Sequence, residues 1–146
     1  MTITKLAAKY ADYFSRIAPD TLDELEAMLS DDVIFIDPFN KLEGKQAFVS
    51  VFAHMFEVMT NPHFEILDVA LSQERAYLKW RMTGTVNAAP KMPFDIIGMS
   101  EIEFDSNGLV RLHHDHWDSA SQLLSHLPYI GWVTGRISRL FAHKNA

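Results

Sequence analysis

The chain has 146 residues, of which 48% are hydrophobic and 22% are charged, and its formal net charge is −6. These values predict one globular domain with a core of its own, and the negative charge argues against nucleic acid as a partner. The sequence has no cysteine, which excludes disulfides and thiolate metal sites. It shows neither the apolar core of a signal peptide nor the roughly 20 apolar residues that span a bilayer. We therefore expect a cytoplasmic protein.

The first part of the chain has the pattern of helices around one strand. Apolar residues recur at three- and four-residue steps, the helical period, over residues 3–17, 18–29 and 43–59. Thr21 and Glu24 have the spacing of a capping box, which predicts the start of the second helix. Residues 32–39 form a β-branched and aromatic run ended by Pro38, which predicts a strand.

From about Phe64 the apolar period changes to two. This pattern predicts four long strands joined by short turns, over residues 63–71, 75–86, 93–105 and 109–118. Asn107-Gly108 predicts a tight hairpin with positive φ at both residues. Helices followed by strands indicate an α+β domain, and we expect a curved antiparallel sheet wrapped by about three helices around a pocket.

Two further helices are predicted at the end of the chain. The sequence SASQ at 119–122 has the form of a capping box, and an amphipathic helix follows in a tail, residues 128–146, distinct from a domain over 1–127. The apolar stripe of the tail is Ile130, Val133, Ile137, Leu140 and Phe141, and its positive charges are Arg136, Arg139, His143 and Lys144. The helix either packs on the domain or lies at a membrane interface, and Gly131 and Gly135 disfavour the second interpretation.

The segment HHDHWD, residues 113–118, lies in the last predicted strand. Because side chains alternate along a strand, one face carries Arg111, His113, Asp115 and Trp117, and the other carries Leu112, His114, His116 and Asp118. Two histidines and a carboxylate on the second face are a ligand set for non-haem iron or zinc. However, side chains two positions apart are about 7 Å apart along a strand, so all three would converge on one ion only with strain. We therefore predict no metal.

The first face is more typical of a cavity wall, because it combines a carboxylate, an imidazole and an indole. The alternative is that Asp115 and His113 form an internal hydrogen-bonded pair or lie at an exposed rim of the sheet. A second candidate, Asp37, ends an apolar strand immediately before Pro38. It either begins a turn, the commonest role of Asp-Pro, or acts as a general base at the mouth of an apolar cavity.

The order of these parts resembles the SnoaL-like and ketosteroid isomerase-like branch of the nuclear transport factor 2-like superfamily. The resemblance rests on YFSRI…LSDDVIFIDPF, EGKQAF and IIGMSEIEFDSNGLVRLHHDHWD, and it covers nearly the whole chain up to Trp117. It implies a cone, in which a strongly bent sheet is closed by three helices around a deep apolar pocket. It also implies an apolar small-molecule ligand, a site without a cofactor, and a homodimer formed through the outer face of the sheet.

The resemblance also assigns roles to individual residues. It implies that Asp37 is the proton-shuttling base and that Tyr13 donates a hydrogen bond to the enolate oxygen. Ser100 stands where the isomerases have a protonated aspartic acid, so this half of the oxyanion site is incomplete. The substrate-contacting residues implied are Phe52, Leu78, Trp80, Met82, Gly98, Ser100 and Trp117.

His113 and Asp115 occupy positions that are apolar in the isomerases, and an aspartate there resembles the acid–base residue of the SnoaL-like polyketide cyclases. We therefore expect proton transfer next to the carbonyl of a bulky apolar substrate, with Asp37 or Asp115 as the base and His113 beside it. One alternative is a non-catalytic ligand-binding or dimerisation module. Another is an epoxide hydrolase, which needs an inward arginine and a second aspartate, whereas Lys79 and Arg81 are predicted to point outward.

Overall fold

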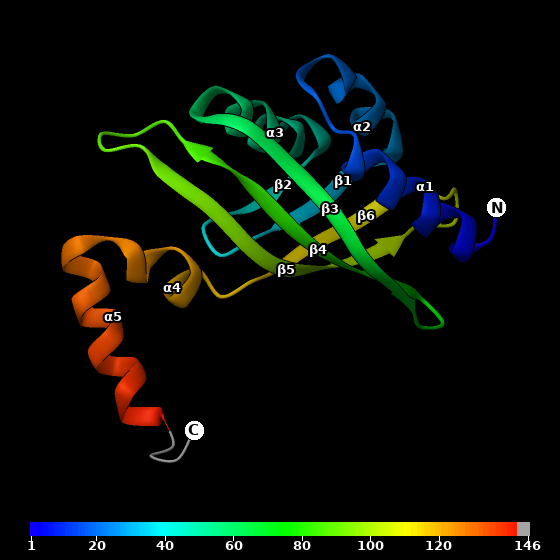
Figure 1. Cartoon of the computed structure of the whole chain (residues 1–146). Helices are drawn as coiled ribbons and strands as arrows, with labels where there is room; N and C mark the ends of the chain where they lie inside the picture. The colour runs from blue at the N-terminus through cyan, green and yellow to red at the C-terminus, as the bar shows by residue number, and fades with distance from the viewer. Residues whose placement is uncertain (143–146) are drawn as a thin grey trace.

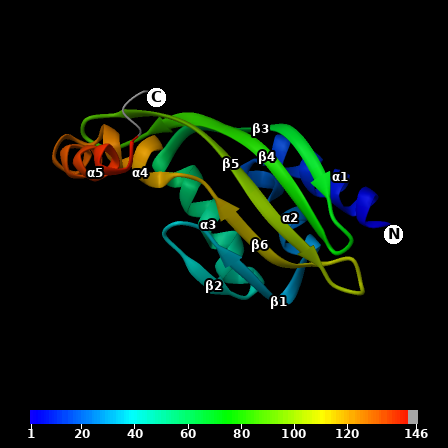
Figure 2. The ribbon, with the colours of Figure 1, turned by 90° about the horizontal axis from the view of Figure 1, so that it is seen from below.

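The structure, a computed structural model, describes residues 1–142, except for the side chains of residues 125, 128–130, 134, 138 and 141. It is α+β, as expected, with three N-terminal helices, a curved six-stranded sheet and short C-terminal helices (Figures 1 and 2). The helices are α1 (Ile3–Ser15), α2 (Leu22–Met28), α3 (Lys45–Val58), α4 (Ser119–Gln122) and α5 (Pro128–Phe141), with 3-10 turns η1 (Pro19–Thr21) and η2 (Leu124–His126). The strands are β1 (Leu29–Ile36), β2 (Lys41–Glu43), β3 (Met59–Leu71), β4 (Arg75–Val86), β5 (Met92–Phe104) and β6 (Val110–His116).

The sheet is open and has the strand order β2-β1-β6-β5-β4-β3. Neighbouring strands pair antiparallel, except that β1 and β6 run parallel. The expectation of an antiparallel sheet is therefore wrong for this pair. The hairpin with β5 fixes the direction of β6, and β6 then adds beside a strand from the other end of the chain.

The core lies between the helices and the concave face of the sheet. Helix α1 buries one stripe at helical spacing, formed by Ala7, Tyr10, Ala11, Tyr13 and Phe14. Helix α3 is preceded by the N-cap residue Gly44, whose φ of +98° favours glycine, and it buries Phe48 and Phe52. Alternation along the long strands directs Ala76, Leu78, Trp80, Met82, Ile96, Ser100 and Ile102 toward these helices.

Two helix starts differ from their predicted capping. The Thr21 hydroxyl accepts from the Ala18 amide and donates to the Ala18 carbonyl, both at 3.0 Å, because it closes the 3-10 turn before α2. Glu24 instead pairs with Arg16 at 2.9 Å. At α4 the cap is Asp118, whose carboxylate accepts from the Ser121 amide at 3.0 Å. The capping boxes predicted for these two helices are therefore wrong.

The β5–β6 hairpin forms where predicted, but with a different turn. Of the two central residues of this turn, Gly108 has a positive φ, +78°, and Asn107 does not. The Asp105 carboxylate accepts from the amides of Asn107 and Leu109 at 2.8 and 2.9 Å and so fixes the turn from one side. Asn107 therefore keeps an ordinary negative φ, and the positive φ falls on glycine, which adopts it without a steric penalty.

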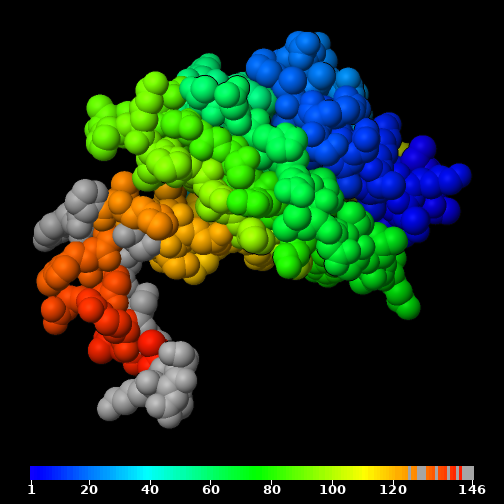
Figure 3. Space-filling model, in the orientation of Figure 1, coloured from blue at the N-terminus to red at the C-terminus, as the bar shows by residue number. Residues whose placement is uncertain are grey.

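Helix α5 extends away from the curved sheet and contacts η2 and α4 (Figures 1 and 3). Val133, Ile137 and Leu140 are exposed, so packing of these residues of the apolar stripe on the domain is not observed. His143 and Lys144 lie outside the described residues, as do the side chains of Ile130 and Phe141. Within residues 1–142, no helix has both the length and the apolarity needed to cross a membrane.

Candidate active site

A buried hydrogen-bonded network lies on the concave face where β5 pairs with β6. Ser100 and Asp115 are directly opposite each other in the register of the two strands. The Ser100 hydroxyl donates to Asp115 Oδ1 at 2.5 Å, and His113 Nε2 lies 2.7 Å from the same oxygen. Two side chains therefore contact the same carboxylate oxygen at hydrogen-bonding distance, one from its own strand and one from the neighbouring strand.

The network continues in both directions from Asp115. Trp80 Nε1 donates to Ser100 Oγ at 2.8 Å, and the Tyr10 hydroxyl lies 2.8 Å from His113 Nδ1. Tyr10, Trp80, Ser100 and His113 are at most 5% exposed, whereas the Asp115 side chain is 15% exposed. Asp115 is thus the member through which the network meets solvent.

The donors of this network point toward one carboxylate oxygen. Among the residues that the structure describes, the Tyr10 hydroxyl has only His113 as a partner, so its hydrogen is assigned to Nδ1. The ring proton is then on Nε2, which donates to Asp115. Burial raises the pKa of the Tyr10 hydroxyl well above its ordinary value, and the charge of Asp115 adds to this shift. Tyr10 therefore remains a donor and holds the imidazole in one tautomer.

The concave face holds a small apolar cavity next to this network. Its lining residues are Phe14, Phe52, Phe64, Ile66, Leu78, Trp80, Ser100, His113 and Asp115. The space for water centres is about 10 Å³, which is room for about one water molecule. The deep pocket implied by the family resemblance is not open in this structure, because aromatic rings fill it: Phe64 lies 5.7 Å from Trp80 and 5.9 Å from Phe14 between ring centroids.

A second, shallow and open hollow lies at the end of β6. It is lined by Asp37, Pro38, His114, Asp115, His116, Trp117 and Asp118. The Trp117 ring packs against Phe39 and Phe94, with centroids 5.7 and 6.0 Å apart. Among the residues whose side chains are described, Asp115 alone borders both this hollow and the apolar cavity, so it stands between the interior and the surface.

Comparison with protein families gives one match that covers most of the chain. The model of the SnoaL-like domain matches residues 10–113. The chain belongs to the SnoaL-like domain family. Comparison with curated proteins gives no match.

Solved structures share the fold of this SnoaL-like domain at low sequence identity. A provisionally assigned polyketide cyclase from Pseudomonas putida KT2440 has a TM-score of 0.69 and 17% identity, over 88% of this chain and 99% of that one. A protein with a ketosteroid isomerase-like fold from Catenulispora acidiphila, solved with trimethylamine, has a TM-score of 0.68 and 15% identity, over 84% and 92%. A provisionally assigned SnoaL-like polyketide cyclase from Shewanella putrefaciens has a TM-score of 0.67 and 17% identity, over 82% and 94%. At these identities the likeness shows the nuclear transport factor 2-like fold.

The SnoaL-like domain brings together most of the residues predicted for the site. Phe52, Leu78, Trp80, Ser100, His113 and Asp115 all line the cavity. Gly98 lies beneath the Trp80 indole, where a Cβ would be only 2.5 Å from the ring. Met82 is buried on the same face but outside the lining, and Trp117 lies in the open hollow.

Asp37 occupies a turn of the SnoaL-like domain rather than the cavity. Its Oδ1 accepts from the amides of Phe39 and Asn40 at 2.8 and 2.6 Å, and its Oδ2 accepts from Asn40 Nδ2 at 3.1 Å. The carboxylate thus closes the turn after β1, the commonest use of Asp-Pro. Asp37 and Asp115 share the open hollow, but only Asp115 lines the apolar cavity.

Tyr13 does not reach the cavity of the SnoaL-like domain either. Its hydroxyl donates to the Thr21 carbonyl at 3.1 Å, and burial raises its pKa. Tyr10, one helical turn earlier, is the tyrosine in the network, and sequence reasoning missed it. The sequence signal it carries is its i,i+4 spacing to Phe14, which places both side chains on one face of the helix; that Phe14 lines the cavity is known only from the structure.

Two other expectations concern the outer face of the sheet. Lys79 and Arg81 are exposed as predicted, and Arg81 pairs with Asp95 at 2.6 Å. No arginine of the described residues lines the apolar cavity, which further disfavours an epoxide hydrolase. Asp118, the third member of the metal set considered along β6, is the cap of α4 and does not join His114 and His116.

Proposed function

We propose that this SnoaL-like domain catalyses cofactor-free proton transfer at a carbon next to a carbonyl, with Asp115 as the base. The observation that supports this assignment is the position of the carboxylate between the cavity and the open hollow. Its Oδ1 is held by Ser100 and His113, while its Oδ2 has no hydrogen bond within the described part of the chain. One oxygen is therefore fixed and the other has lone pairs available for a proton.

The remaining members of the network act as positioning residues. His113 orients the carboxylate through Nε2, and Tyr10 fixes the tautomer of His113. Ser100 holds the carboxylate from the neighbouring strand β5, and Trp80 on β4 holds Ser100. A base must lie within hydrogen-bonding reach of the proton that it removes, and a carboxylate fixed at one oxygen has little freedom to lose that geometry.

The same network limits the substrate. Each donor of Tyr10, Trp80, Ser100 and His113 is already directed within the network, and the rest of the cavity wall is carbon. The described residues therefore offer no spare donor for an enolate oxygen in the cavity, the interaction that usually stabilises such a charge. We infer a β-dicarbonyl substrate, because its second carbonyl delocalises the negative charge. With room for about one water in the cavity, this substrate would approach from the hollow beside Trp117.

Deuterium exchange at carbon tests this proposal directly. We would incubate the protein in D₂O with an α-alkyl β-keto ester and follow loss of the α-proton by NMR. We expect the wild type to accelerate exchange and Asp115→Asn to lower the acceleration by about 10²- to 10⁴-fold. Asp37→Asn tests the other candidate base, which also borders the hollow, and should retain the rate within a few-fold, because its carboxylate is used in a turn.

Equal exchange rates with wild type and Asp115→Asn would contradict the assignment of the base. The second candidate function is a non-catalytic ligand-binding or dimerisation module, which the small cavity and the saturated network favour. In that case Ile97 and Met99, exposed on the outer face of the sheet, would serve contact with another copy of the chain. No acceleration by the wild type, together with a dimer in light scattering, would support this module instead.

A further inference from the structure

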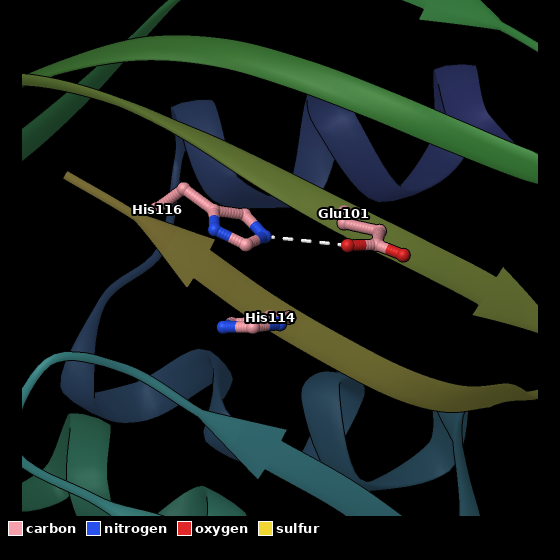
Figure 4. Close-up of side chains that lie close together, drawn as sticks. All are labelled: Glu101, His114 and His116. Carbon is pink, nitrogen blue, oxygen red and sulfur yellow. Dashed lines mark hydrogen bonds and ion pairs between the residues drawn. The ribbon is translucent and has the colours of Figure 1, made fainter.

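The outer face of the sheet carries a second cluster of polar side chains, separate from the Asp115 network. It consists of Glu101 on β5 and His114 and His116 on β6 (Figure 4). Glu101 is directly opposite His114 in the register of the two strands, and Met99 is opposite His116. Because side chains alternate, these three residues lie on the face opposite His113 and Asp115.

The ligand atoms of the three side chains converge. One ring nitrogen from each histidine and one oxygen of Glu101 all lie within 4.8 Å of one another. The two imidazole rings have centroids 3.8 Å apart, and His116 Nε2 is 3.2 Å from Glu101 Oε2. The strain expected for three ligands on one strand does not apply to this set, because the third ligand comes from the adjacent strand and the two imidazole rings lie beside each other.

We propose that Glu101, His114 and His116 form a binding site for one divalent transition-metal ion, with Zn²⁺ as the expected ion. Two imidazoles and one carboxylate suit zinc and its first-row neighbours, whereas magnesium and calcium prefer all-oxygen ligands. Tetrahedral ligands about 2.0–2.1 Å from zinc are about 3.4 Å apart. The ligand atoms must therefore close by about 1.4 Å at most from their 4.8 Å limit, which rotation of the half-exposed His116 side chain can supply.

The surroundings of Glu101 support this role. Arg75 Nη1 holds Glu101 Oε1 at 2.5 Å and leaves Oε2 facing His116. Arg75 is itself held by Glu103, which also pairs with Arg111 at 2.9 Å. Metal-binding carboxylates are commonly oriented by such outer partners. The His116 side chain is 52% exposed, so the remaining coordination positions are open to water.

Zinc titration of the full chain, freed of metal with a chelator, tests the proposal. We expect isothermal titration calorimetry to give one Zn²⁺ per chain, and zinc to raise the melting temperature. His116→Gln and Glu101→Gln should each weaken binding by more than 100-fold, beyond the roughly 10–100-fold that loss of an outer partner causes. Arg75→Met should fall within that smaller range.

The matched control is His54→Gln. His54 also lies beside a carboxylate, Glu57, at 3.4 Å, but this pair has no third ligand in the part of the chain that the structure describes. Its affinity for zinc should equal that of the wild type. Copper(II) provides a second readout, because electron paramagnetic resonance should show two nitrogen ligands in the wild type and one in His116→Gln.

Two results would overturn the site. One is a wild-type affinity no higher than those of His116→Gln and Glu101→Gln, and the other is an equal loss in His54→Gln, which would indicate scattered binding to surface histidines. Circular dichroism of each variant checks that the fold is retained. The zinc titration measures binding and not exchange at carbon, so failure of one proposal is distinguishable from failure of the other, although His114 and His116 also line the open hollow beside Asp115.

Discussion

Replacing Gly98 with alanine should disturb the candidate site without changing any polar group. Gly98 lies on β5 directly opposite Trp80, and its φ is one that alanine also adopts. A Cβ at Gly98 would be 2.5 and 2.6 Å from Cη2 and Cζ2 of Trp80, and 2.9 Å from Cβ of Trp117. The penalty is therefore steric, and it falls on a rigid indole ring and on backbone-linked atoms rather than on a flexible side-chain end.

The structure gives the size of the effect. Restoring ordinary contact, about 3.4 Å, moves the indole by about 0.9 Å from its 2.5 Å position, which is enough to lose the 2.8 Å bond from Trp80 Nε1 to Ser100. Overpacking costs about 1–3 kcal/mol and the lost hydrogen bond about 1 kcal/mol. Alanine also lowers the conformational entropy of the unfolded chain, which stabilises the folded protein by about 0.4–1 kcal/mol. We expect a net loss of about 2 kcal/mol.

Urea unfolding followed by circular dichroism measures this loss, and tryptophan emission reports the displaced indole. Gly135→Ala is the control, because a Cβ there meets nothing within 4 Å and alanine favours the helix. It should not lower the free energy of unfolding. A Gly98→Ala protein within about 0.5 kcal/mol of the wild type, with unchanged emission, would refute the packing argument.

Three smaller predictions concern single residues. Because burial raises the pKa of Tyr10 above that of an unfolded tyrosine, stability should fall as the pH rises above about 10, by at most about 1.4 kcal/mol per pH unit from this group. Urea unfolding from pH 8 to 11 measures how steeply the free energy of unfolding falls with pH. This fall should be smaller in Tyr10→Phe, and equal falls in the two proteins would contradict the raised pKa of Tyr10. Asp118→Ala removes the cap of α4, which should speed exchange of the Ser121 amide about five-fold for a typical loss of ~1 kcal/mol; unchanged exchange would show that the cap is dispensable. Gly108→Ala forces a side chain into a φ of +78° and should lower the free energy of unfolding, measured by thermal unfolding, by about 1–2 kcal/mol. Asn107→Ala should have little effect. Equal losses in the two variants would instead support a turn with positive φ at both positions.

Alternation and helical spacing were sufficient to predict most of the fold. Leu78, Trp80 and Met82 have a clear period of two, and their strand is buried on that side. Pairing between strands far apart in the sequence leaves no such periodic signal. The parallel contact of β1 with β6 was therefore not predicted, because it depends on where the last strand adds to the sheet.

The part of the candidate site that lies on a single strand could be predicted from the alternation of side chains along that strand. Asp115 and His113 lie on one face, as alternation required, and their hydrogen bond was one of the interpretations left open. Tyr10 was missed because the family resemblance assigned the donor role to Tyr13, which lies three residues later on the same buried face of α1. Glu101 was missed because only the register between β5 and β6 places it opposite His114. Register is a tertiary property, and a single strand does not contain it.

The late position of β6 in the chain has a consequence for synthesis. Until residues 110–116 are made, β1 and β2 are separated from β3, β4 and β5, and each group has an unpaired edge beside the missing strand. Leu29 and Val110 pair across 81 positions (110 − 29), and such distant pairing slows folding. A chain interrupted before Val110 would therefore be prone to aggregate. The strand that joins the two halves also carries Asp115, so a molecule acquires this carboxylate only together with a complete sheet.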